Sequence, residues 1–287
     1  MARQFDLQIL RSELGEGARR HLTRLLDFTC TKPEWILIRF EAGVVADVLV
    51  LAAPSKFNLP LEIIRLHGGL DAGIDSLRLF QRAIKNAKGL GVRELYCSVP
   101  EDAADASALS LAGFRRWRKV VRFESAGPID LGVRNYRSAA VGKFARAEII
   151  ALIEKTSERC SDSQIEFYRQ RLGGIADAEM TLRMMESTRY DHRWWRVALA
   201  PDGNTVGIIF PVVAFGEPTV GFIGIIPKYR GRNIASFLLT EAWSVMKHQG
   251  YSTLCAEADE RSVSMHRALT KSQFNRETQK QEWRLDL

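Results

Sequence analysis

The sequence predicts an α/β chain whose two halves repeat one order of strands and helices. Its 287 residues suit about two domains of roughly 150 residues each. Runs rich in β-branched residues alternate with runs whose apolar residues recur at helical spacing. The order recurs at a nearly constant offset, since Gly91 lies 159 residues before Gly250 (250 − 91) and Phe114 lies 160 before Phe274 (274 − 114). We therefore expect two similar domains in tandem.

Residues 219–245 join a strand, a basic turn and a helix. Residues 219–226 are rich in β-branched and aromatic side chains, and Pro227 cannot donate to a sheet ladder, so a strand should end there. From Ile234 the apolar residues recur at helical spacing. The N–H groups and dipole of a helix start favour an anion, and Gly231 lets a phosphate approach the main chain. The segment is typical of a phosphate-binding turn.

The turn Tyr-Arg-Gly-Arg-Asn-Ile-Ala, residues 229–235, resembles the pyrophosphate loop of the GNAT N-acetyltransferases, which use acetyl-coenzyme A (acetyl-CoA). The family pattern is Arg or Gln, two residues, Gly, one residue, then Gly or Ala. Arg230 and Ala235 match this pattern, whereas Asn233 stands where Gly is usual. Asn tolerates unusual backbone angles and also caps helices well. The strands and helices expected downstream follow the order of the family's second half.

The resemblance covers about residues 133–287 and implies a tandem GNAT protein with a degenerate N-terminal copy. Each half would be a mixed, mostly antiparallel sheet flanked by helices. We expect a GNAT-like domain without a phosphate loop at 1–126 and an acetyltransferase domain that binds acetyl-CoA at 133–287. The junction should lie at 125–132, where Gly and Pro are dense.

Other elements are expected from the same patterns. In the N-terminal half they are a strand ending near 66, a helix to 88, a strand at 92–99 and a helix at 104–112. In the C-terminal half they are two helical stretches within 146–191 and strands or helices at 252–258, 265–271 and 282–287. Trp194 and Trp195 should begin a strand through Leu199, so one indole should face inward and the other outward.

The two phosphate turns differ in charge. At the offset of 159, Arg230 falls on Asp71, and the turn at 67–73 carries no Lys or Arg. A fixed carboxylate near a pyrophosphate is repulsive. We therefore expect coenzyme A to bind only the second domain.

In the family, the strand before the loop splays from its neighbour, and its exposed edge pairs with the pantetheine amides as an added strand would. Gly224 either eases a bulge or close approach there or is simply tolerated in a strand. The amides of residues 232–236 and the side chains of Arg230 and Arg232 would hold the pyrophosphate. The expected cofactor-binding residues are Ile225, Ile226, Arg230, Gly231, Arg232, Asn233, Ile234, Ala235 and Ser236.

No catalytic residue is assigned. The family's usual Tyr position carries Leu269, which cannot donate a proton, and the usual Asn position carries Ser262. Gln273 replaces the customary Gly before Phe274. The candidate acids and bases in the right region of sequence are Tyr229, Tyr251, Asp259 and His266.

Each candidate also has a structural interpretation. His266 sits among helical apolar residues, as a surface or satisfied residue would. Glu257 and Asp259 share a strand face, where they either activate an amine through water or pair with Arg261 or Arg267. The presence of Glu217 is explained equally well by a hairpin-like turn and by a catalytic role. The cluster of Met180, Leu182, Met184 and Met185 is either an adaptable acceptor pocket or core.

Composition and charge indicate which kinds of ligand, metal and cellular location to expect. The net charge of +7 suits an anionic ligand. In the basic stretch 115–122 the arginines at 116, 118 and 122 share a strand face and the aromatics point away, which disfavours nucleic acid. Four scattered cysteines lack metal spacing, so we expect reduced thiols and no metal. Without a membrane span or secretion signal, the prediction is a cytoplasmic protein.

The leading hypothesis is an N-acetyltransferase that acts on a primary amine of a small molecule or a peptide. One alternative is a non-enzymatic acyl-CoA-binding module, which Leu269 favours. The other is a basic scaffold that binds nucleic acid or a protein partner. The acceptor and the oligomeric state stay open.

Overall fold

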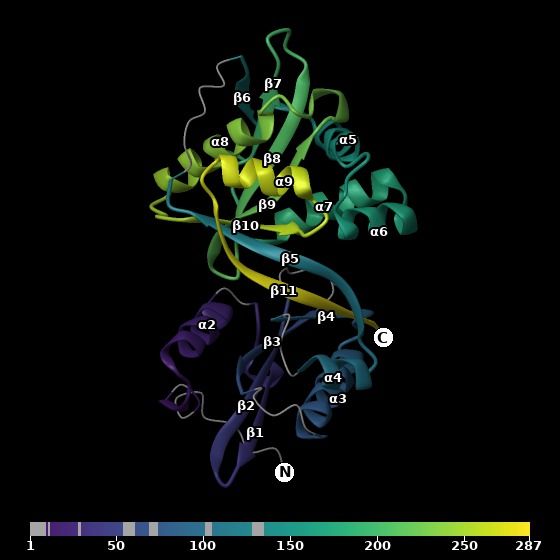
Figure 1. Cartoon of the computed structure of the whole chain (residues 1–287), viewed down its shortest axis with the longest axis vertical. Coiled ribbons are helices and arrows are strands. Elements are labelled where there is room, and N and C mark those ends of the chain that lie inside the picture. The colour runs from purple at the N-terminus through teal and green to yellow at the C-terminus, as the bar shows by residue number, and fades with distance from the viewer. Residues whose placement is uncertain are drawn as a thin grey trace. The chain divides into compact units, whose positions relative to one another are not determined.

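The structure, a computed structural model, describes residues 10, 12–27, 30–53, 61–68, 74–100, 105–127 and 135–287. These residues divide into two compact units. Unit 1 takes the described residues up to Trp117 together with Lys280–Leu287, and unit 2 takes Arg118–Gln279. Both units contain a mixed sheet flanked by helices (Figure 1), which confirms the predicted fold class.

Unit 1 has the strand order β1-β2-β3-β4-β11, in which β3 and β4 are parallel and the other neighbours antiparallel. Helix α2 lies on one side of these strands, and α3 and α4 lie on the other (Figure 1). The core lies between the sheet and α3 and α4, where Phe80, Leu95 and Leu109 are fully buried. The elements are α2 (Glu16–Asp27), a 3-10 turn (Pro33–Trp35), β1 (Ile36–Glu41), β2 (Val44–Ala52), β3 (Leu61–His67), α3 (Ile74–Gly89), β4 (Glu94–Pro100) and α4 (Asp105–Leu111).

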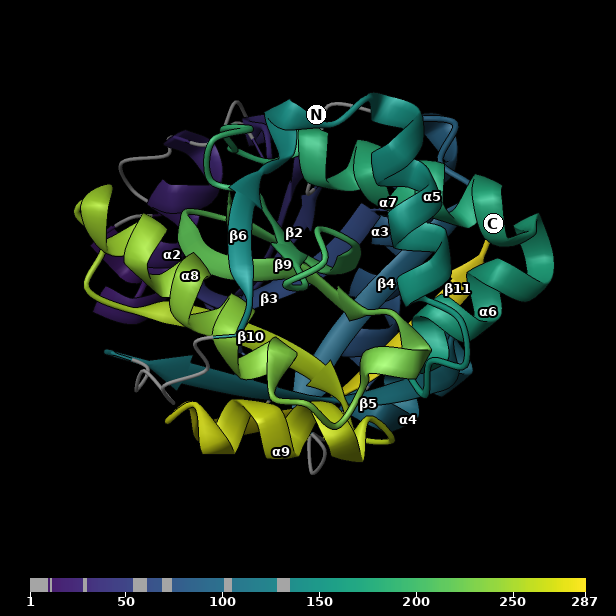
Figure 2. The ribbon, with the colours of Figure 1, turned by 90° about the horizontal axis from the view of Figure 1, so that it is seen from above.

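Unit 2 has the strand order β5-β10-β9-β8-β7-β6, in which β9 and β10 are parallel and the other neighbours antiparallel. Helix α8 packs on one side of β8 and β9, and α5 and α7 pack on the other (Figure 2). Its elements up to β8 are β5 (Arg115–Ser125), β6 (Arg137–Ala140), a 3-10 turn (Val141–Lys143), α5 (Arg146–Thr156), α6 (Ser163–Leu172), α7 (Gly174–Ser187), β7 (Arg196–Leu199) and β8 (Thr205–Ala214). Then follow β9 (Glu217–Ile225), a 3-10 turn (Pro227–Tyr229), α8 (Ile234–His248), β10 (Leu254–Asp259), α9 (Val263–Lys271) and β11 (Asn275–Asp286). Over the described ranges, no helix combines the length and the apolar character that crossing a membrane requires.

The last strand of each half is exchanged. Strand β5 follows β4 and α4 in the chain, yet its residues 120–125 pair with β10 in unit 2. Strand β11 follows β10 and α9, yet its residues 280–286 pair with β4 in unit 1. The units therefore interleave along the chain, whereas the predicted domains at 1–126 and 133–287 divide it once. Residues 128–134 lie outside the described ones, so that boundary stays a prediction.

The predicted elements are present with shifted ends, but residues 146–191 form three helices where the sequence analysis expected two. The missed helix is α6. Its start has a readable signal, because the carboxylate of Asp162 accepts hydrogen bonds from the N–H groups of Gln164 and Ile165 at 2.9 and 3.1 Å. An Asp in this N-cap position is a common helix start.

The prediction that one of the two neighbouring indoles faces outward is wrong. Trp194 is 8% exposed and Trp195 is 0% exposed. Strand β7 begins only at Arg196, and the N–H of Trp194 donates to the carbonyl of Asp191 at 2.8 Å in the preceding turn. Strand alternation does not apply in a turn. Trp195 instead stacks on Tyr190, with ring centroids 4.7 Å apart.

Candidate functional site

Strands β9 and β10 pair for only a short distance. Their parallel register joins Thr219 to Cys255 and Val220 to Ala256. Strand β9 then continues along β8 as far as Ile225, and β10 continues along β5 as far as Asp259. Among the residues that the structure describes, no ladder joins β9 to β10 beyond Val220. The two strands therefore diverge towards the turn that follows β9, as the resemblance implied.

A β-bulge marks the start of this wedge. Phe222 pairs with Phe210 and Val220 pairs with Pro211, which leaves Gly221 unpaired on β9. Gly224, three residues later, is a place of close approach, because an added Cβ would lie 2.5 Å from the Cβ of Thr156 in α5. Of the alternatives for Gly224, the structure therefore supports close approach and places the bulge at Gly221.

The turn after β9 presents backbone N–H groups at the start of α8. Gly231 and Asn233 have φ angles of +79° and +60°, the left-handed region that Gly and Asn tolerate. The first helical hydrogen bond runs from the N–H of Phe237 to the carbonyl of Asn233 at 3.1 Å. The N–H groups of residues 234–236 thus have no partner within the helix. N–H groups in this position at a helix start can bind an anion.

Asn233 occupies the N-cap position without capping. Its side chain makes no bond to the helix start, and its Oδ1 accepts from the Nζ of Lys271 at 2.9 Å. Asn is thus suited to this place by its backbone tolerance rather than by its capping ability. The bond to Lys271 also ties the turn to the end of α9.

The guanidinium of Arg230 is held by the protein itself. It donates to the carbonyl oxygens of Ile225, Thr156, Glu158 and Arg159 at 3.1, 2.9, 2.6 and 2.8 Å. Thr156 is the last residue of α5, so Arg230 fixes the turn against the C-terminal end of this helix. A contact between the Arg230 side chain and a phosphate stays a prediction.

The other predicted cofactor residues lie along one continuous stretch. Arg232 is exposed, and its guanidinium carbon lies 5.4 Å from the ring centroid of Tyr229. The Nζ of Lys228 lies 4.9 Å from the same ring, so two cations lie close to Tyr229. Of the remaining residues, Ile234 and Ser236 are buried, and Ile225, Ile226 and Ala235 are half-buried.

The candidate acids and bases on β10 and α9 are engaged in structural contacts. Asp259 is 1% exposed, and its carboxylate accepts from the N–H groups of Ser163 and Arg261 at 2.9 and 2.8 Å. The Nε2 of His266 lies 3.0 Å from the carbonyl of Asp259, so this nitrogen carries the donated proton. The His266 ring also packs edge-on against Phe123. Both residues therefore support the fold around β10.

The remaining candidates do not supply an evident proton donor. Leu269, at the family's usual Tyr position, is 1% exposed and belongs to the core. Tyr251 precedes β10 and so lies at the end of this strand opposite the wedge. Ser262 is buried at the start of α9. The assignment of a catalytic residue stays open.

Glu217 belongs to a polar cluster of side chains from β5, β9 and β10. One terminal nitrogen of Arg122 donates to Glu217 at 2.9 Å, and the other donates to the sulfur of Cys255 at 3.0 Å. Burial raises the pKa of Cys255 to about 12, so it is a neutral thiol at physiological pH. Arg118 likewise pairs with Asp162 at 3.4 Å. These two arginines of the basic strand are thus partly neutralised within unit 2.

The described cysteines form no disulfide, and no metal-binding group is found among the described residues. Cys30, Cys97 and Cys255 are buried free thiols, and Cys160 is a half-buried one. Across the described part of the chain, no three His, Cys, Asp or Glu side chains are grouped so that they could hold a metal ion.

Comparisons with known proteins establish the fold. No family model matches the chain, and no curated protein matches it. The structure is similar to a GCN5-related N-acetyltransferase from Sphaerobacter thermophilus, with a TM-score of 0.55, 16% identity and coverage of 85% of this chain and 78% of that one. A tandem GNAT protein from the clavulanic acid biosynthesis pathway gives a TM-score of 0.52 at 15% identity, over 93% and 87% of the chains. A GCN5-related N-acetyltransferase from Kribbella flavida gives 0.55 at 14% identity, over 94% and 95%. The chain therefore has the GNAT fold in tandem.

Proposed function

We propose that unit 2 binds acetyl-CoA in the wedge between β9 and β10 and transfers the acetyl group to a primary amine. The early end of the β9–β10 ladder carries this proposal. Among the described strands, it leaves one edge of β9 without a partner from Gly221 to Ile225. An extended chain of amides, such as pantetheine, pairs with such an edge as an added strand does.

The turn that follows this edge suits a pyrophosphate. Unpaired N–H groups at residues 234–236 begin a helix of 15 residues, whose dipole favours negative charge. Arg232 stands exposed beside them. In this proposal Arg230 acts from behind, because its bonds to four carbonyls hold the turn in shape. Thus Arg230 would support the site, while the amides and Arg232 would contact the phosphates.

The chain would contribute to the reaction mainly by positioning. Acetyl-CoA supplies an activated acyl carbon when it is bound. The nitrogen of a neutral amine attacks this carbon, the carbon–sulfur bond breaks, and a proton from the amine ends on the thiolate. Since Leu269 cannot donate a proton, we assign this transfer to water. Fixing both ends of the cofactor in the wedge makes the attack effectively intramolecular.

Binding is the first test. Acetyl-CoA should raise the melting temperature of the protein, and calorimetry should give one site per chain. Arg232→Glu should weaken binding about tenfold, because it places a carboxylate beside the phosphates. Arg19→Glu, on the exposed side of α2 in unit 1, is the matched charge reversal and should leave affinity unchanged. A protein that ignores acetyl-CoA would rule the proposal out.

Turnover is the second test. Release of free coenzyme A thiol with members of an amine panel would support the transferase. Binding without any release would favour the alternative, a non-enzymatic acyl-CoA-binding module. The buried Leu269 and the occupied His266 are the observations on its side. As part of the transferase proposal, we place the protein in the cytoplasm and expect a small-molecule or peptide acceptor. The alternative function requires neither.

A further inference from the structure

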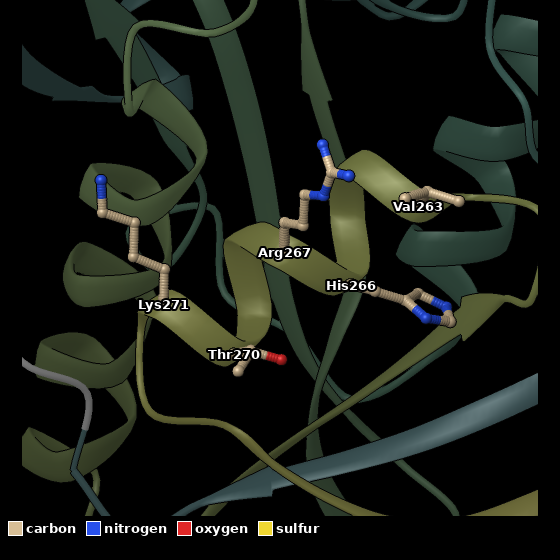
Figure 3. A pocket seen from close by; sticks show the side chains of 5 residues that line it. All are labelled: Val263, His266, Arg267, Thr270 and Lys271. Atoms are coloured by element: carbon tan, nitrogen blue, oxygen red, sulfur yellow. The ribbon is translucent and has the colours of Figure 1, made fainter.

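Helix α9 bears a shallow hollow beside the candidate site. Its volume is about 420 Å³, and one stripe of α9 lines it (Figure 3). The lining residues are Val263, His266, Arg267, Thr270 and Lys271. Arg267 and Lys271 lie four residues apart and project from the same side of the helix (Figure 3). Their Cβ atoms are therefore about 5–6 Å apart, one helical turn.

The hollow adjoins the phosphate-binding turn. Lys271 reaches the side chain of Asn233 at 2.9 Å, and Asn233 immediately precedes the free N–H groups of α8. Within the described ranges, neither Arg267 nor Lys271 has an ion-pair partner, and the hydrogen bond of Lys271 to Asn233 goes to a neutral amide. Two uncompensated cations thus lie one helical turn apart on α9, beside the loop that precedes α8. A second phosphate next to the first would satisfy both.

We propose that this hollow receives the 3′-phosphorylated ribose and the adenine of coenzyme A, so that the protein prefers coenzyme A to its 3′-dephospho form. The inference rests on the proposed function. The 5′-diphosphate and the 3′-phosphate are attached to one ribose, so a diphosphate on the turn brings the 3′-phosphate to its immediate neighbourhood. Arg267 and Lys271 supply charge there, and Thr270 supplies a hydroxyl.

The far end of the hollow suits a base. Val263 is 54% exposed, and the ring of His266 lies one turn from it on the same stripe. An apolar side chain and a flat ring offer contact area to adenine without demanding a specific hydrogen bond. The stripe therefore changes from cationic beside the turn to apolar away from it, in the same order as phosphate and base in the nucleotide.

Paired binding measurements test the inference. Dissociation constants for coenzyme A and 3′-dephospho-coenzyme A are measured by calorimetry at low salt. The wild type should prefer coenzyme A about tenfold, the size of one charge-assisted phosphate contact. Arg267→Ala and Lys271→Ala should each reduce the preference to about threefold, and the double variant should abolish it. Loss of the Lys271 bond to Asn233 should act on both ligands alike and leave their ratio unchanged.

Arg261→Ala is the matched control. Arg261 is an exposed arginine just before α9 that pairs with Glu166 at 3.2 Å, so its loss should leave the preference intact. Equal binding of the two ligands by the wild type, or a preference that survives in the double variant, would overturn the inference while the proposed function stands. Failure of both ligands to bind would overturn both.

Discussion

In both units the two parallel strands diverge after a short ladder, but the side chains next to the point of divergence differ in charge. In unit 1 the parallel register joins Leu61–Ile63 to residues 95–97, although β3 continues to His67 and β4 to Pro100. In unit 2 the corresponding strands are β9 and β10, which part after Val220. The repeat detected in the sequence thus extends to the place where the neighbouring strands diverge.

Unit 1 fills the region next to its wedge with buried charge. Arg65 on β3 donates to Asp47 on β2 at 2.5 Å and to Asp105 at the start of α4 at 2.7 Å. Arg39 donates to the other oxygen of Asp47. Asp47 is 1% exposed and Asp105 is 4% exposed. The guanidinium of Arg65 also lies 5.5 Å from the ring centroid of Phe80 in α3, so it bridges β3 to both helices on that face.

Unit 2 has no charge at the positions that lie one repeat later in the sequence. Gly207, Ile225 and Met265 each lie 160 residues after Asp47, Arg65 and Asp105 (207 − 47, 225 − 65 and 265 − 105). Ile225 even lies over Gly207, where an added Cβ would come within 2.7 Å of its Cδ1. One copy closes this region with an ionic bridge, and the other keeps it small and apolar. The difference supports the proposal that only unit 2 binds coenzyme A, whereas Asp71, on which the sequence prediction rests, lies outside the described residues.

The largest expected effect comes from removing the bridge. Arg65→Met should lower the free energy of unfolding by about 3–5 kcal/mol, because it leaves the buried Asp105 without its cation and leaves Asp47 with Arg39 alone. Denaturant unfolding measures this loss. The triple variant with Asp47→Asn and Asp105→Asn should recover much of the stability, since neither buried carboxylate remains and Arg39 keeps its pair with Glu41. Coenzyme A affinity should not change, and a loss of affinity with Arg65→Met would contradict the assignment of the bridge to unit 1 alone.

A second comparison concerns one buried carboxylate in each unit. Burial raises the pKa of Asp105 in unit 1, although Arg65 lowers it in part; burial raises the pKa of Asp177 in α7 of unit 2 to about 6, although Arg169 lowers it in part. The folded state therefore holds this proton above the usual pKa of about 3.9. Stability should fall as pH rises from about 4 to 6, by about 2–3 kcal/mol.

Unfolding as a function of pH measures this slope. Asp177→Asn should remove it and stabilise the protein at pH 7, because the buried group no longer has to ionise. Glu179→Gln on the same helix, a half-buried carboxylate that pairs with Arg183, is the control and should keep the slope. An unchanged slope in Asp177→Asn would contradict the assignment.

The third test concerns the turn between β9 and α8 in unit 2, where Asn233 has a left-handed φ angle. Asn233→Val should weaken coenzyme A binding about tenfold, since a β-branched residue in this conformation costs about 1–2 kcal/mol. Asn233→Gly should keep the affinity within about twofold, because Gly adopts the angle freely. Calorimetry distinguishes them. Equal weakening by both would mean that the Asn233 bond to Lys271, rather than its backbone, is what the site requires.

The smallest effect compares the residues before Phe114 and Phe274. Both positions are left-handed, with φ of +95° at Gly113 and +58° at Gln273. Gln273→Gly should stabilise the protein by up to about 1 kcal/mol, and Gly113→Ala should destabilise it by about 1 kcal/mol. Thermal unfolding of both variants measures the opposite signs. Two shifts of the same sign would refute the structural equivalence of these turns.

Much of the candidate site is predictable because its signals are local. The strand that ends before Pro227, the helix that begins at Ile234 and the turn between them follow from propensities and backbone preferences of neighbouring residues. The same holds for the repeat, which is a property of the order of elements. The missed helix α6 also had its local signal in Asp162. By itself, therefore, the sequence determined the α/β class, the tandem repeat and the position of the turn between β9 and α8.

Tertiary structure decided what depends on partners far away in the chain. The bonds of Arg230 to residues 156–159, the ionic bridge of Arg65 and the closeness of Lys271 to Asn233 join segments that no local pattern connects. The exchange of β5 and β11 is of the same kind. Strand pairing depends on which edges meet in the folded chain, and β5 and β11 each pair with a strand that lies far away in the sequence. Only the tertiary structure brings those edges together.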